Sequence, residues 1–124
     1  MKLINDIQLT ENFMLSEFAC RDPNKSVYVD FKLLTNLQKL RDFLGVPIYI
    51  NSGYRTDAYN KQIGGAPTSQ HTFGKAVDIK KIPGVSDKQF VLIASLCGFG
   101  GIGVYETYYH IDVRSERARW WDES

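Results

Sequence analysis

The sequence is poor in the residues that build disulfide frameworks and zinc fingers. Its 124 residues include only two cysteines and two histidines. Cys20 and Cys97 lie far apart and form no CxxC motif, so a structural zinc finger is excluded by its ligand count. We expect both cysteines to be free buried thiols, and the alternative is a disulfide between them.

Net charge and long apolar runs are also missing. The formal net charge is +1 at pH 7, which gives no reason to expect nucleic acid or a membrane surface as a partner. No apolar run is long enough to cross a bilayer. The N-terminus has Asp6 where a signal peptide would need apolar residues, so we expect synthesis in the cytoplasm.

The order of the elements predicts an α+β fold. Leu33, Leu37, Leu40 and Leu44 fall on one face of a helix that Asp30 caps and that stops at Gly45. Shorter helices are expected over 56–63 and 87–97, and strands over 47–52, 75–79, 100–105 and 108–113. The last two strands would form a hairpin, which requires antiparallel pairing. We therefore expect one domain over residues 1–124, with helices packed on a largely antiparallel sheet.

Both histidines lie beside strands that glycines interrupt, and each has an aspartate nearby. Side chains alternate along a strand, so Asp78 shares a face with Ala76, and His110 shares a face with Asp112. We predict that His71, Asp78 and His110 hold one Zn²⁺ and leave a fourth position to water. The alternative is that both histidines are ordinary polar residues.

Three separated motifs resemble the zinc D-Ala-D-Ala carboxypeptidases, the M15 peptidase family, whose members share the fold of the Hedgehog signalling domain. The motifs are Ser52-Gly53-Tyr54-Arg55, Ser69-x-His71-x-x-Gly74-x-Ala76-x-Asp78, and Gly101-Ile102-Gly103 leading to His110-Ile111-Asp112. The resemblance implies a zinc metallopeptidase that hydrolyses a peptide bond in peptidoglycan. Carboxypeptidase and murein endopeptidase activity both remain open, and the small size suits a phage or prophage product.

The resemblance also implies roles for single residues. His71, Asp78 and His110 would be the zinc ligands. Arg55 would act near the scissile carbonyl or the substrate carboxylate, and Ser69 would hydrogen-bond the substrate. A guanidinium beside zinc suits the oxyanion that peptide hydrolysis develops.

One departure from the family pattern concerns the general base. Several members have an acidic residue three positions before the second histidine, where this chain has Thr107. We predict Glu106 as the base. Asp112 is expected at the substrate-binding site, and the alternatives for it are the base itself or a partner that orients an imidazole.

The rival to a peptidase is a non-catalytic domain of the same fold that holds zinc or binds the cell wall. In both cases the expected partner is a peptidoglycan stem peptide, and the protein is expected to be a monomer. We expect it to reach the cell wall after lysis or as a component of a virion. Trp120 and Trp121 are expected to cover the core at the C-terminus, with wall binding as the alternative.

Overall fold

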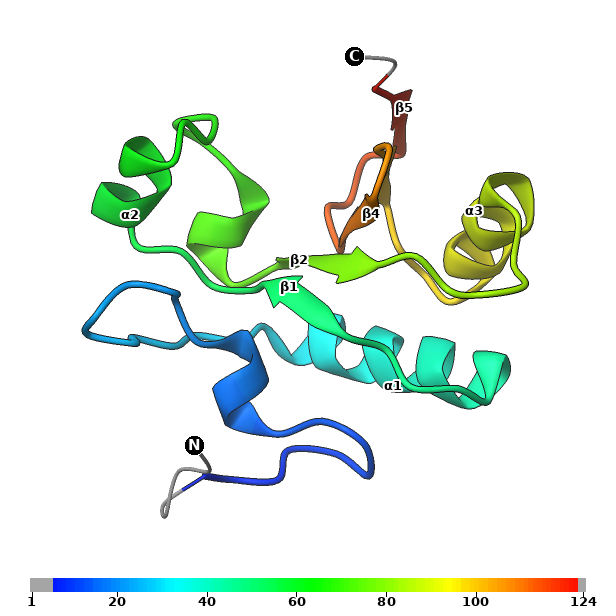
Figure 1. Ribbon diagram of the computed structural model, residues 1–124, viewed down its shortest axis with the longest axis horizontal. Helices are drawn as coiled ribbons and strands as arrows, with labels where there is room; N and C mark the ends of the chain where they lie inside the picture. Colours follow the sequence, from blue (N-terminus) through cyan, green and yellow to red (C-terminus); the bar gives the residue numbers. More distant parts are fainter. Residues whose placement is uncertain (1–5, 123–124) are drawn as a thin grey trace.

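The computed structural model describes residues 6–122, which form helices, 3₁₀ turns and one sheet (Figure 1). The elements in chain order are η1 (Leu15–Phe18), α1 (Phe31–Leu44), β1 (Ile50–Ser52), α2 (Asp57–Gln62), η2 (Gln70–Phe73), β2 (Ala76–Lys80), α3 (Asp87–Leu96), β3 (Gly101–Val104), β4 (Tyr108–Asp112) and β5 (Ala118–Trp121).

The sheet has the strand order β1-β2-β4-β3-β5. Neighbouring strands pair antiparallel from β1 to β3, and only β3 and β5 run parallel. The prediction of helices on a largely antiparallel sheet is confirmed. The adjacent strands β2 and β4 come from separate parts of the sequence, and they carry Asp78 and His110.

The helices begin and end where the sequence predicts. The Asp30 carboxylate accepts a hydrogen bond from the Lys32 amide at the start of α1, and Gly45 ends that helix with a left-handed φ of 69°. The hydroxyls of Thr56 and Ser86 cap α2 and α3 in the same way. Each cap satisfies a backbone N–H that the first helical turn would leave without a partner.

The apolar core lies on one face of the sheet. Val77 and Ile79 of β2 are fully buried, as is Ile111 of β4. They belong to one cluster with Leu37 of α1 and Phe90 of α3, so these two helices cover that face. Alternation along the strands then turns Asp78 and His110 to the opposite face.

The structure corrects two expectations about the strands. The first strand is shorter than 47–52: Ile48 is buried, but regular pairing starts at Ile50 and an irregularity follows before Ser52. The tail with Trp120 and Trp121 does more than cover the core, because it forms β5. No helix among residues 6–122 is long and apolar enough to cross a membrane.

Candidate metal centre and active site

One row of residues crosses the whole sheet and carries most of the site. Ser52 is opposite Asp78, and Asp78 is opposite His110. His110 is in turn opposite Gly103, which is opposite Trp120. The register of four strand pairs therefore sets the aspartate and the second histidine side by side.

The first histidine reaches this row from η2 rather than from a strand. The Ser69 hydroxyl accepts a hydrogen bond from the His71 amide at 3.2 Å and caps the turn. The His71 ring Nδ1 lies 2.8 Å from the carbonyl oxygen of Gly53, at the end of β1. These contacts orient Nε2 of His71 toward Asp78.

His71, Asp78 and His110 come together as predicted. His71 Nε2 and His110 Nδ1 each lie 3.1 Å from Asp78 Oδ1, and one ligand atom from each residue lies within 4.8 Å of the others. All three residues are buried, with at most 9% of each exposed. This group could hold a metal ion.

The hydrogen bonds on the outer side of each ring determine which nitrogens carry protons. A carbonyl oxygen only accepts, so Nδ1 of His71 carries the proton that it donates to Gly53. His110 Nε2 lies 2.7 Å from Asp112 Oδ2 and donates to that carboxylate. In the neutral rings, Nε2 of His71 and Nδ1 of His110 therefore present lone pairs to Asp78 Oδ1.

Three converging lone pairs repel one another unless a cation lies among them. Two imidazole nitrogens and one carboxylate oxygen form an established zinc-binding set that leaves a fourth position open. A tetrahedral ion with bonds of about 2.0–2.1 Å separates its ligand atoms by about 3.3 Å, and the two measured separations are 3.1 Å. The residues present therefore fit such an ion.

The pKa values of Asp78 and His110 reflect the same contacts. Burial acts to raise the pKa of Asp78, but the hydrogen bonds and charges that His110 and His71 supply when they are protonated outweigh it and hold the pKa well below its usual range. Burial also acts to lower the pKa of His110, yet the hydrogen bonds and charges of Asp112 and Asp78 raise it above 6.5. A proton and a metal ion would compete for the same nitrogen of His110.

Arg55 approaches the trio from the turn after β1. Its Nη2 donates to Asp78 Oδ2 at 3.0 Å, on the carboxylate oxygen that does not face the histidines. Its Nε donates to Ser52 Oγ at 3.1 Å, and its Nη1 donates to Asn60 Oδ1 at 3.3 Å. A guanidinium has five N–H groups, so Arg55 is fixed by three and keeps two for a substrate.

Asn60, which is 2% exposed, connects Arg55 to the loop that follows α2. Its side-chain Nδ2 donates to the Ala66 carbonyl at 2.7 Å, and its backbone carbonyl accepts from the Gly65 amide at 2.8 Å. One side chain thus positions both the guanidinium and a loop that borders the site.

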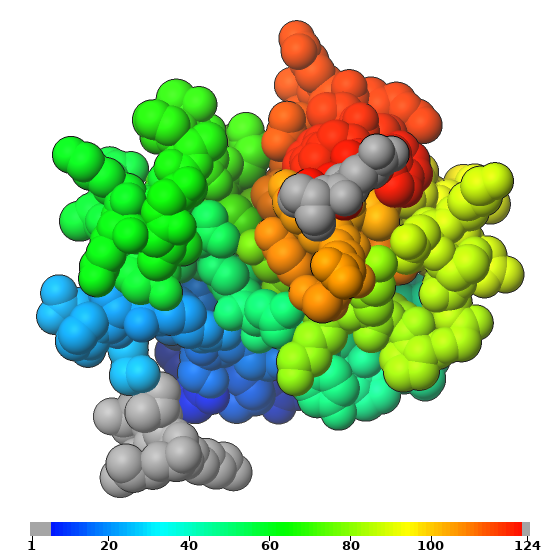
Figure 2. Space-filling model, turned by 45° about the horizontal axis from the view of Figure 1, so that its top comes forward, coloured from blue at the N-terminus to red at the C-terminus, as the bar shows by residue number. Residues whose placement is uncertain are grey.

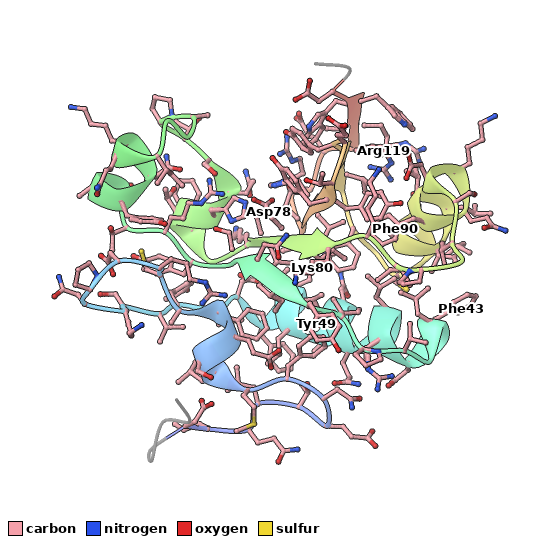
Figure 3. The ribbon with its side chains drawn as sticks, viewed as in Figure 1. Phe43, Tyr49, Asp78, Lys80, Phe90 and Arg119 are labelled. Carbon is pink, nitrogen blue, oxygen red and sulfur yellow. The ribbon has the colours of Figure 1, made fainter. Side chains whose placement is uncertain are left out.

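The trio lies in a pocket of about 630 Å³. One side consists of Arg55 and the loop from Ile63 to Gln70, and the other side consists of residues from β4, β5 and the β3–β4 turn. In Figure 2 the green segment and the orange-to-red segment rise on either side of a depression. Figure 3 shows Asp78 between these two parts, on the sheet.

The second side of the pocket is aromatic. The rings of Tyr105 and Tyr108 stack with centroids 4.5 Å apart, and the indole N–H of Trp120 donates to the Tyr105 hydroxyl at 2.9 Å. Trp120 also lies 5.3 Å from the His110 ring. It reaches this position across Gly103, where a Cβ atom would clash with the indole.

The other predicted site residues lie in different places. Ser69 lines the pocket. Asp112 is fully buried behind His110 and does not line it, so its position suits orientation of the imidazole better than contact with a substrate. Glu106 is exposed at the β3–β4 turn and lines a neighbouring cavity with Lys81 and Trp121. A role as general base would require that turn to move, and it stays a prediction.

A family model described as Peptidase M15 matches residues 11–114. The chain belongs to this peptidase family. The match covers all three candidate metal ligands and Arg55, and it ends before β5, so Trp120 lies outside it. No curated protein matches the chain. Membership in the M15 family, together with the trio, supports a peptidase that can hold a metal ion.

The sequence did not single out Asn60 or Arg114 as parts of the site, and Trp120 was expected to cover the core, with wall binding as the alternative. Asn60 precedes the double glycine of a loop, a signal that is too common to single it out. Arg114 follows Asp112 by two residues and so continues the face of His110 past the end of β4. Trp120 enters the pocket only because β5 pairs with β3, which no local pattern reveals.

Proposed function

We propose that the protein is a zinc-dependent metallopeptidase that hydrolyses a peptide bond in peptidoglycan. The observation that carries this proposal is the convergence of two imidazole lone pairs on Asp78 Oδ1, at 3.1 Å each, inside an open pocket. Membership in the peptidase M15 family supports it. The motifs that resemble the zinc D-Ala-D-Ala carboxypeptidases support peptidoglycan as the substrate.

His71, Asp78 and His110 would hold the zinc ion. When bound, zinc supplies Lewis acidity toward a carbonyl oxygen and toward water. Arg55 has two unused N–H groups beside Asp78, and they can donate to the oxyanion that forms as the amide carbonyl becomes tetrahedral. Because Ser52, Asn60 and Asp78 fix this guanidinium in advance, it needs little reorganisation during the reaction.

Asp112 would position a metal ligand, and Ser69 would both cap η2 and bind the substrate. Asp112 accepts from His110 Nε2 and keeps Nδ1 free of its proton, which is the tautomer that a metal ligand needs. Ser69 caps η2, and its own hydroxyl hydrogen remains able to donate to a substrate in the pocket. The stacked tyrosines form an apolar wall along which a peptide can lie.

Incubation with defined muropeptides, followed by mass spectrometry of the products, tests this function. We expect cleavage that depends on added zinc and is lost in the variant Arg55→Gln. Loss of terminal D-Ala would indicate a carboxypeptidase, and fragments cut within the stem or bridge would indicate an endopeptidase. Zinc bound at one per chain with no cleavage of any muropeptide would instead support the non-catalytic domain.

A further inference from the structure

The pocket contains a second guanidinium that the proposed reaction leaves unused. Close polar contacts run from Arg55 to Asp78, from Asp78 to His110, from His110 to Asp112, and from Asp112 to Arg114. An arginine therefore stands at each end of this series, with the candidate metal ligands between them. Both arginines line the pocket.

Arg114 is held firmly along one edge. Its Nε and Nη2 donate to the Asp112 carboxylate, Nη2 at 2.7 Å. The guanidinium carbon lies 5.2 Å from the centre of the Trp120 ring, and the Tyr105 hydroxyl holds the indole in turn. Asp112 is fully buried, while the Arg114 side chain is 31% exposed. The guanidinium is thus oriented before any ligand arrives, which reduces the entropy that binding costs.

The other edge of Arg114 is available. Its Nη1 forms no hydrogen bond with any residue from 6 to 122, and one N–H of Nη2 is also unused by the Asp112 contact. Neighbouring N–H groups of a guanidinium match the two oxygens of a carboxylate, which makes arginine the common partner of such anions.

The charges in the pocket also favour an anion. Asp78 is the one carboxylate among the described residues that line it, and Asp78 already faces Arg55 and both histidines. Two guanidiniums and a bound dication would outweigh the charges of Asp78 and Asp112. A ligand with carboxylates at two points would meet a cation at each of them.

We propose that Arg114, held by Asp112 and Trp120, binds a carboxylate of the substrate at a position separate from the one that Arg55 serves. The inference rests on the proposed peptidase function and defines its substrate class as an anionic peptide. Peptidoglycan stems offer this chemistry from two sources: the C-terminal carboxylate and the free α-carboxylate of the γ-linked D-Glu.

The test compares matched peptides with matched variants. The probes are the stem peptide L-Ala-γ-D-Glu-L-Lys-D-Ala-D-Ala, its C-terminal amide, and its D-isoglutamine form. For the unmodified chain, we expect amidation of the recognised carboxylate to lower kcat/KM about tenfold or more, since a lost hydrogen bond to a charged group has this effect. The amidated peptide that is cleaved more slowly identifies which of the two carboxylates Arg114 binds. In Arg114→Gln, the acid and amide forms should be cleaved at equal rates.

The comparison separates binding from damage to the metal site. Arg114→Gln also removes a partner of Asp112, so it can lower all rates, but a purely structural role would lower them for acid and amide alike. Arg117, which is exposed and does not line the pocket, provides the control variant Arg117→Gln, and the preference for the acid form should survive in it. Calorimetric binding of the same peptides to chelator-treated protein gives a readout that does not depend on turnover.

A preference for the acid form that persists unchanged in Arg114→Gln would overturn the proposal, as would equal cleavage of acid and amide forms by the unmodified chain. Failure of the proposed function looks different, because no peptide would be cleaved at all. In that case the calorimetric preference for the acid form, and its loss in Arg114→Gln, still decides the role of Arg114.

Discussion

Asp78 contacts both histidines and Arg55 in the candidate metal centre. One of its oxygens faces both imidazoles, and the other accepts a hydrogen bond from Arg55. Since its pKa lies well below the usual range, Asp78 stays ionised at every pH at which the imidazoles are neutral. A negative oxygen at the meeting point of two imidazole lone pairs is a strong attraction for a cation.

The position of Glu106 outside the pocket leads to a clear prediction. Loss of a general base typically costs 10²–10⁴-fold in rate. Glu106 lines the neighbouring cavity, so as the predicted base it would act after the β3–β4 turn moves, and we expect Glu106→Gln to lower kcat/KM for a muropeptide about a hundredfold or more. A value within about threefold of the unmodified chain would show that Glu106 is not the base.

The affinity for metal should depend on pH in a way that His110 dictates. The metal ion needs the neutral ring, and the pKa of His110 is raised above its ordinary 6.5. A proton therefore competes with zinc for the His110 ring at a higher pH than it would at an ordinary histidine. We expect zinc affinity to fall as the pH drops through neutrality. Titration with zinc at a series of pH values measures this.

Asp112→Asn provides the comparison for the pH experiment. Removing the carboxylate removes one of the groups that raise the pKa of His110, so affinity should start to fall at a lower pH. At high pH, where the proton no longer competes, affinity should be about 10–100-fold weaker because the ring loses its orienting partner. If zinc affinity begins to fall at the same pH in the unmodified chain and in Asp112→Asn, this explanation is contradicted.

At the scale of elements, the glycines of β3 leave space that side chains from the two neighbouring strands fill. A Cβ atom at Gly101 would clash with the Asp112 carboxylate, and one at Gly103 would clash with the Trp120 indole. Both glycines lie beside β4 in register with the site, Gly101 opposite Asp112 and Gly103 opposite His110. The strand therefore makes room for the residues that orient and border the candidate metal centre.

Gly103→Ala should displace the Trp120 indole from His110. Overpacking of a tight site costs about 1–3 kcal/mol of unfolding free energy, which chemical denaturation measures. In Trp120→Leu, where the smaller side chain leaves room for a methyl group, the same substitution should cost much less, so the two changes should be strongly non-additive. Additive losses would show that the close approach of the indole does not cause the destabilisation.

The elements that local chemistry determines were predicted well from the sequence, and the others were not. Asp30, Thr56 and Ser86 cap helices because a side-chain oxygen lies next to free amides, and these contacts span two or three residues. β5 was missed because its pairing with β3 is parallel and involves long-range contacts, among them those of the Arg119 guanidinium, which donates to the Gly100 carbonyl and Ser95 hydroxyl. Contacts of this kind leave no periodic signal near residue 120.

At the scale of the whole molecule, the site joins two segments that are far apart in the sequence. Residues 55–71 form one side of the pocket and residues 105–120 form the other, and the pairing of β2 with β4 brings them together. The candidate metal ligands could be singled out from the sequence because histidine and aspartate have a strong chemical signature. Asn60, Arg114 and Trp120 could not, since their roles come from contacts that only the folded chain creates.

A metal ion that joins η2, β2 and β4 should stabilise the whole fold. A ligand at a thousand times its dissociation constant adds about 4 kcal/mol to the free energy of unfolding, so zinc should raise the melting temperature by about 10 °C or more. Differential scanning calorimetry with and without a chelator measures the change. A melting temperature that neither zinc nor the chelator changes would contradict a metal ion held among these elements.

The most direct test counts metal ions in the purified protein. Elemental analysis of the unmodified chain should give one zinc per chain, and His71→Ala, Asp78→Ala and His110→Ala should each lose it, while Glu106→Gln should retain it. A chain that binds no zinc, or that keeps its zinc when any one of the three ligands is removed, would contradict the metal centre described above.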